Sequence, residues 1–199
     1  MKKMKLSLLA VALMVVTAAS AQVSFGIQGG VNLSNIQEQG SNPKVGFNVG
    51  VLTDFGLTHN IGIRSGLSFH TKGANAESDR VFSRTNLMYL QIPVHFAYKI
   101  DVMPGTRVVL HAGPYVAYGV GGSHTINPNY SGENPDLSVF GSGDTQLKPF
   151  DFGLGLGVGF EFGRFLTGIG WDMGLLNIAS IEGGTARNMN AHLTVGFRF

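Results

Sequence analysis

The chain contains no cysteine among its 199 residues, which excludes disulfide bonds, thiolate catalysis and cysteine-bound metals. Charge is scarce as well: Asp, Glu, Lys and Arg together make up 13% of the chain, against the ~25% usual in soluble domains. Beyond the N-terminal stretch, no segment has the 3.6-residue spacing of an amphipathic helix. Glycine is abundant instead, with 29 residues against an ordinary share of ~7%. These features argue against a helical or disulfide-stapled protein.

The N-terminus has the pattern of a secretory signal peptide. Lys2, Lys3 and Lys5 precede an apolar run over residues 6–16, and Ala19-Ser20-Ala21 supplies the small residues of a cleavage site. The run is shorter than the ~20 residues that a membrane helix needs. We therefore expect a signal peptide over residues 1–21 and one domain over residues 22–199. Removing three lysines from the 14 Lys and Arg leaves 11 against 12 Asp and Glu, a net charge of −1, so no nucleic-acid partner is expected.

Eight segments of the remaining chain alternate between large apolar residues and small or polar ones, which is the period of a β-strand. They cover residues 23–35, 44–55, 60–70, 86–99, 106–119, 148–163, 164–176 and 189–199. The connections between them are alternately long and short. This rhythm predicts an up-and-down antiparallel meander, with the short turns at one side of the sheet and the long loops at the other.

Segment 148–163, KPFDFGLGLGVGFEFG, indicates which face is inside. Its apolar face runs from Phe150 to Phe162, while its other face carries four glycines between Asp151 and Glu161. Glycine suits the crowded interior of a narrow barrel, and an unbroken apolar face suits lipid. We predict an all-β, eight-stranded antiparallel up-and-down transmembrane β-barrel of the outer-membrane type. The alternative is a secreted soluble barrel with an apolar, ligand-binding interior.

Charged and histidine side chains recur on the face predicted to line the lumen. Because charges in a low-dielectric interior must be paired, we interpret them as a salt-bridged plug that fills the barrel. Arg107 and Glu161 are both expected near the short-turn end. The alternative is a narrow pore with a charged constriction. The predicted lumen cluster comprises Arg64, His95, Arg107, His111, Asp151, Glu161, Asp172 and Arg198.

Candidate catalytic and metal-binding patterns are weak. Four of the six histidines alternate with the apolar residues of a strand and so have lumen parity, meaning that they face the predicted lumen. None of the six forms an HxH or HExxH spacing. The serine in "GSGD" (141–144) lacks the strand–turn–helix context of a nucleophile elbow. We therefore expect no catalysis, no cofactor and no metal.

Four motifs give the chain a family resemblance: YLQIPVHFAYKI (89–100), HAGPYVAYGVGG (111–122), FDFGLGLGVGFEF (150–162) and HLTVGFRF (192–199). With them the chain resembles the PorT-like small outer-membrane β-barrel proteins of Bacteroidetes. The resemblance implies an outer-membrane location, eight antiparallel strands and contact with membrane lipid. It also implies that the outer-membrane assembly machinery reads the last strand, with Phe199 as the assembly signal.

The long connections are where we expect any ligand to bind. Irregular connections above ~12–15 residues are uncommon and are usually functional or disordered, and two segments, 71–85 and 120–147, fit that description. We expect a monomer with a structural role or a binding role carried by these loops outside the cell. A narrow channel for small solutes is the alternative function.

Overall fold

The computed structural model describes residues 22–36, 41–78, 81–128, 137–141, 147–180 and 186–199. None of these residues forms a helix long and apolar enough to cross a membrane. The strands are β1 (Gln22–Ile36), β2 (Ser41–Gly56), β3 (Ile61–Ser78), β4 (Val81–Met103), β5 (Thr106–Pro128), β6 (Leu137–Ser138), β7 (Phe150–Phe162), β8 (Phe165–Gly174) and β9 (Asn188–Arg198).

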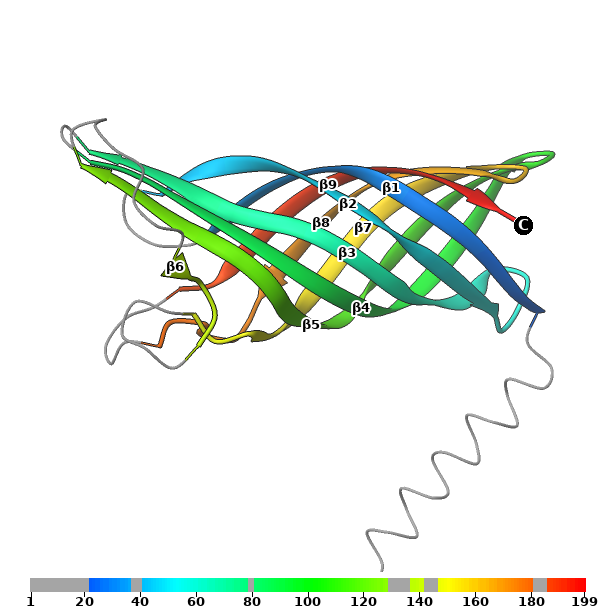
Figure 1. Ribbon diagram of the computed structural model, residues 1–199. Coiled ribbons are helices and arrows are strands. Elements are labelled where there is room, and N and C mark those ends of the chain that lie inside the picture. Colours follow the sequence, from blue (N-terminus) through cyan, green and yellow to red (C-terminus); the bar gives the residue numbers. More distant parts are fainter. Residues whose placement is uncertain (1–21, 37–40, 79–80, 129–136, 142–146, 181–185) are drawn as a thin grey trace, which may run out of the picture.

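Eight of the strands close into a barrel in which every neighbouring pair is antiparallel. The order β4-β3-β2-β1-β9-β8-β7-β5 is closed by pairing between β4 and β5, while the short β6 pairs only with β5. The predicted eight-stranded fold is therefore confirmed. Gly105 and Gly163 take left-handed φ angles of 77° and 58° in tight turns, a conformation that glycine adopts without steric cost. These turns, the start of β1 and the C-terminus share one end of the barrel (Figure 1), called here the short-turn end.

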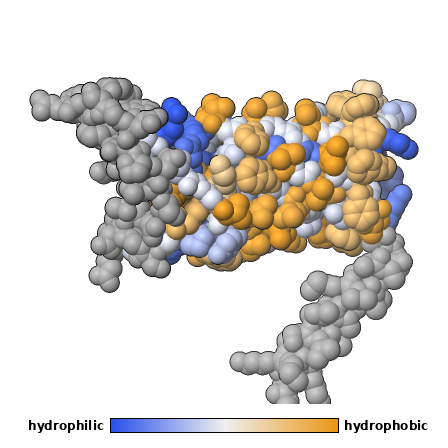
Figure 2. All heavy atoms as spheres, in the orientation of Figure 1, coloured by the Kyte–Doolittle hydropathy of each residue, from blue (hydrophilic) through white to orange (hydrophobic). Residues whose placement is uncertain are grey.

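The apolar face of the strands points outward. Leu156 is 60% exposed, whereas its neighbour Gly157 is buried, and the same alternation holds along β7 as a whole. Figure 2 shows apolar residues over the middle of the barrel surface and more hydrophilic residues towards its two ends. Exposed carbon of this extent would be unstable in water but is what a bilayer requires.

The glycines of β7 make room for large side chains inside the barrel. A methyl group on Gly155 would lie 2.8 Å from His95 Nε2, and one on Gly157 would lie 2.6 Å from His111 Cε1. A methyl group on Gly153 would lie 2.6 Å from the Tyr115 ring. The interior is thus filled from β4 and β5, and β7 contributes a nearly bare backbone.

The structure corrects the two predicted loops at the opposite, long-loop end. Segment 71–85 is largely strand, because β3 continues to Ser78 and β4 begins at Val81. Segment 120–147 begins as strand too, because β5 continues to Pro128 and pairs there with Val81. The prediction failed because strands beyond the bilayer need no apolar face, so the alternation that marks them disappears. Together the ends of β3, β4 and β5 form a ribbon that projects past β7, β8 and β9 (Figure 1), and the start of β2 pairs with β3 as far as Ala76.

Candidate functional site in the barrel lumen

The lumen at the short-turn end is crossed by an ion cluster, defined here as Asp54, Arg64, Lys99, Glu161 and Arg198. Arg64 Nη2 lies 3.0 Å from Asp54 Oδ2 and 2.8 Å from Glu161 Oε1. Lys99 Nζ lies 3.0 Å from Asp54 Oδ2, and Arg198 Nη2 lies 2.5 Å from Glu161 Oε1. The two carboxylates are almost fully buried. Because these residues belong to five different strands, the cluster ties opposite walls of the barrel together.

The predicted lumen cluster contained only part of this ion cluster. It included Arg64, Glu161 and Arg198, which the structure brings together, but it did not include Asp54 and Lys99. Both missed residues have lumen parity in their strands, and Asp54 lies directly opposite Arg64 in the β2–β3 register. The parity signal was therefore sufficient to find them.

Arg107, a member of the predicted lumen cluster, lies at the short-turn end but outside the ion cluster. The backbones of Arg107 and Glu161 are paired across β5 and β7, but Arg107 Nε donates to Asp101 Oδ1 at 2.7 Å on the exposed rim. A long side chain at a strand end can reach water, and solvation of its charge favours that position.

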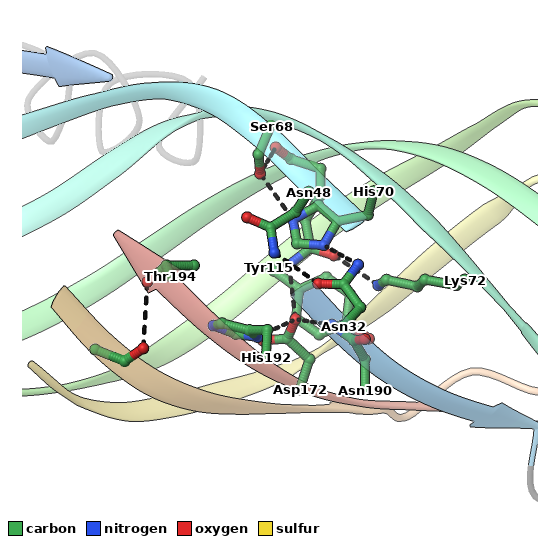
Figure 3. A network of polar contacts seen from close by, with 12 residues as sticks. Asn32, Asn48, Ser68, His70, Lys72, Tyr115, Asp172, Asn190, His192 and Thr194 are labelled. Carbon is green, nitrogen blue, oxygen red and sulfur yellow. Dashed lines mark hydrogen bonds and ion pairs between the residues drawn. The ribbon is translucent and has the colours of Figure 1, made fainter. Parts of the chain in front are cut away.

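The middle of the lumen holds a hydrogen-bonded network centred on Asp172 (Figure 3). Asp172 Oδ2 accepts hydrogen bonds from Gln91 at 3.1 Å and Asn190 at 3.4 Å. His192 Nδ1 lies 3.8 Å from the same oxygen. The Gln91 amide oxygen in turn accepts a hydrogen bond from Lys72 Nζ at 2.7 Å. The network joins β3, β4, β8 and β9 across the barrel.

His95 and His111 form a separate pair beside this network. Their Nδ1 atoms are 3.0 Å apart, and their ring planes differ by 17°. In a hydrogen bond between these two atoms, one ring donates Nδ1–H and the other ring accepts. Both rings line an interior cavity of about 80 Å³. Within the described residues, no group of three or more His, Asp or Glu is arranged to hold a metal ion.

Asp151 occupies a third level, nearer the long-loop end. It is fully buried and accepts hydrogen bonds from Asn188 Nδ2 at 2.9 Å and Tyr115 Oη at 3.3 Å. Lys72 Nζ lies over the faces of the Tyr115 and Tyr89 rings, 5.2 and 5.5 Å from their centroids. Cation–π attraction and one hydrogen bond offset part of the cost of burying this ammonium group.

An apolar cap covers the lumen above Asp151. It consists of buried side chains from β1, β3, β4 and β5 and from segments that connect strands, and the Phe140 ring packs edge-on against Tyr89 at 5.4 Å. Backbone hydrogen bonds from Leu147 to Val139 and from Lys148 to Ile178 hold its layers together. The buried members are Ile36, Ala74, Leu87, Tyr89, Tyr115, Ala117, Val139, Ile178 and Ala186.

Sequence reasoning missed Lys72 and the whole apolar cap. Lys72 was placed in a loop, although it has the same parity as His70 and therefore continues the lumen face of β3. Val139 and Ile178 offered no such signal, since they lie in connecting segments without a period. The predicted polar cluster is thus distributed over three levels of the lumen, with Arg107 at the rim.

The arrangement fills and bridges the barrel interior. Ion pairs cross the short-turn end, hydrogen bonds cross the middle, and apolar side chains pack together at the long-loop end. Together with the outward apolar face, these features define a membrane-spanning β-barrel with a packed lumen. The chain belongs to the family of outer membrane protein β-barrel domains, whose model matches residues 18–180. Its location is therefore the outer membrane, which excludes the soluble ligand-binding barrel.

Solved outer-membrane proteins show distant likenesses to the chain. Ail of Yersinia pestis is 13% identical, with a TM-score of 0.49, over 89% of this chain and 99% of that one. Neisserial surface protein A is 11% identical, with a TM-score of 0.49 and the same coverage. OprG of Pseudomonas aeruginosa is 12% identical, with a TM-score of 0.47, over 90% of this chain and 97% of that one. Among curated proteins there is no significant match.

Proposed function

We propose that the protein is a closed outer-membrane barrel that acts by binding outside the cell, through its ribbon, and neither catalyses a reaction nor conducts solutes. One contrast supports the proposal: the lumen is bridged at three levels and capped, whereas β3, β4 and β5 remain paired far beyond the end of β7, with β2 paired to β3 as far as Ala76. The pairing of β5 with β7 stops at Tyr118, whereas the pairing of β5 with β4 continues as far as Pro128. Ten further residues of strand extend about 34 Å.

The side of the membrane follows from the turns. Outer-membrane barrels have short periplasmic turns and longer extracellular loops, so we assign the short-turn end to the periplasm and the ribbon to the outside. A paired ribbon has less conformational entropy to lose on binding than an irregular loop of the same length. The ribbon and the rest of segments 71–85 and 120–147 are our proposed ligand-binding region, on a barrel that acts as a monomer.

Trimming the ribbon tests this proposal. Replacing residues 76–83 with an Asn-Gly hairpin turn would shorten the ribbon while leaving the barrel strands intact. Purified wild-type and trimmed proteins in lipid nanodiscs would be applied to arrays of glycans and extracellular proteins. We expect the wild type to bind at least one class of array component and the trimmed protein to lose that binding. A matched control places the same turn at residues 57–60. Equal binding by the trimmed protein would contradict the proposal.

A narrow channel is the second candidate function. Two observations favour it: the interior cavity beside His95 and a cavity of about 590 Å³ at the short-turn mouth, lined in part by Arg107 and Arg198. Movement of the ion cluster would connect these two spaces. Single-channel recording separates this candidate from the closed barrel.

Within the family, we propose that the chain belongs to the PorT-like branch. The support is the set of motifs at 89–100, 111–122, 150–162 and 192–199. A phylogenetic tree of the family that placed the chain outside that branch would contradict this assignment.

A further inference from the structure

An apolar groove of about 540 Å³ crosses the outer surface of the barrel over β7, β8, β9, β1 and β2. The smallest outward side chain in the groove is that of Ala191, which lies opposite Trp171 on β8 and opposite Leu33 on β1. A methyl group between an indole and an isobutyl group leaves a depression in the barrel wall. The other outward side chains along it are Val31, Val45, Leu156, Val158, Ile169 and Leu193.

Two cations lie at the long-loop end of the same side of the barrel. Lys148 N donates to Ile178 O, and Ile178 N donates to Ala186 O. Each hydrogen-bonded step separates neighbouring strands by about 4.8 Å, so the backbones of Lys148 and Ala186 are about 10 Å apart. Lys148 and Arg187 are both exposed. Among the described residues neither forms an ion pair.

Arg187 is aligned with the groove along β9. Burial alternates from Arg187 through Met189 to Ala191, so these three side chains share the outer face. Four residues of strand span about 14 Å, which places the groove in the hydrocarbon beneath the cation. A molecule with an anionic head and an apolar chain of similar length would match both features at once.

We propose that this groove and the two cations bind one anionic, phosphate-bearing lipid of the membrane. Its phosphate lies between Lys148 and Arg187, and one acyl chain fills the depression over Ala191. Each cation near a membrane surface raises the affinity for anionic lipid about fivefold. An acyl chain in the depression makes dispersion contacts that the side chains around an empty depression would lack. A second copy of the protein fits less well, because a two-fold interface sets identical patches together and would bring the cations of both copies close.

Tryptophan fluorescence can report on the groove, because Trp171 is the only tryptophan of the chain and lines the groove. The protein would be reconstituted in phosphatidylcholine vesicles containing brominated-chain phosphatidylglycerol or, at the same mole fraction, brominated-chain phosphatidylcholine. Bromine quenches the indole on contact. We expect stronger quenching by the anionic lipid, with the difference shrinking as salt screens the headgroup contact.

Variants separate the contribution of the cations from that of the groove. Lys148→Gln and Arg187→Gln should each lower the preference for the anionic lipid about fivefold. Ala191→Leu fills the depression and should lower quenching by both brominated lipids, whereas Val195→Leu, on the same face outside the groove, should not. Each variant alters an outward side chain, and its folding is checked by the heat-dependent gel shift of intact barrels.

Three results would overturn the proposal. The first is equal quenching by the two brominated lipids at every salt concentration. The second is an unchanged quenching profile in Ala191→Leu. The third is quenching that falls as protein is concentrated in the vesicles, together with cross-linked dimers, because a second copy would then occupy the groove. The ribbon plays no part in this experiment, so its outcome is independent of the proposed extracellular binding.

Discussion

The two ends of the lumen are filled by side chains of opposite chemistry. At the short-turn end, two buried carboxylates and three cations from five regular strands meet in the ion cluster. At the long-loop end, the apolar cap is made largely of carbon, and some of it comes from connecting segments such as those containing Val139 and Ile178. The ion cluster is formed by the strands of the barrel wall, whereas part of the apolar cap is formed by segments that connect the strands.

This difference has energetic consequences. Removing one partner of a buried ion pair leaves an uncompensated charge that the rest of the barrel cannot avoid. Removing carbon from the cap creates a cavity that a connecting segment can partly relax or locally open. The short-turn end should therefore control global stability, and the long-loop end should control local access to the lumen.

Glu161→Ala should have the largest effect, because it leaves Arg64 and Arg198 with only Asp54 to balance them. Breaking a buried pair in this way costs about 3–5 kcal/mol, measured as the change in the free energy of unfolding by urea in lipid vesicles. Arg107→Gln, at the exposed rim of the same end, is the matched control and should unfold as the wild type does. Equal effects of the two variants would show that the ion cluster does not stabilise the barrel.

Leu156 lies between the two ends of the barrel, and Leu156→Arg gives a reference loss of stability with which the other variants can be compared. Arginine at a lipid-facing midplane position costs about 2–4 kcal/mol, and Leu156 is 60% exposed on the outer face. The same refolding experiment measures the loss. Wild-type stability in this variant would mean that Leu156 does not face hydrocarbon.

Ile178→Ala should affect the long-loop end alone. Ile178 is fully buried in the cap, and truncation of a buried isoleucine costs about 2–5 kcal/mol when the site cannot relax. Because this segment can open locally, we expect global stability to fall by about 2 kcal/mol or less, while limited proteolysis of the cap speeds up. Leu176→Ala, two residues earlier and exposed, is the control. Proteolysis at the wild-type rate would remove the distinction between the two ends.

Deletion of Phe199 should change stability least. Its side chain is 69% exposed, and its backbone N–H donates to Phe25 O at 2.9 Å. If Phe199 is the signal read by the assembly machinery, its deletion lowers the amount of barrel in the outer membrane without weakening the barrel once it is folded. Quantifying the protein in membrane fractions checks this expectation. An unchanged amount would contradict it.

The same contrast governs what the sequence could predict. The bilayer demands an apolar residue at every second position, so strand number and the orientation of Leu156 and Gly157 were readable from alternation. The same alternation places Arg64, Glu161 and Arg198 on the lumen face, and it places Asp54 and Lys99 there too, although the predicted cluster did not include them. Arg107 has the right parity, but at a strand end its side chain can reach the exposed rim.

The long-loop end was not readable in this way. The ends of β3, β4 and β5 lie beyond the bilayer, so no apolar alternation marks them as strand, and Lys72 was assigned to a loop. Ile178 and Val139 meet the barrel only through long-range packing, and nothing in their local sequence encodes that contact. Rules imposed by the membrane thus predicted the wall of the barrel but not the cap.

Single-channel recording in planar bilayers tests the central claim, a lumen closed at both ends, most directly. The wild-type barrel should show no conductance steps, because the ion cluster and the apolar cap each block the lumen. Ile178→Ala and Arg107→Gln should also show no conductance steps, since the ion cluster remains intact in both variants. Regular conductance steps from the wild-type protein at moderate voltage would contradict the closed lumen and favour the narrow channel.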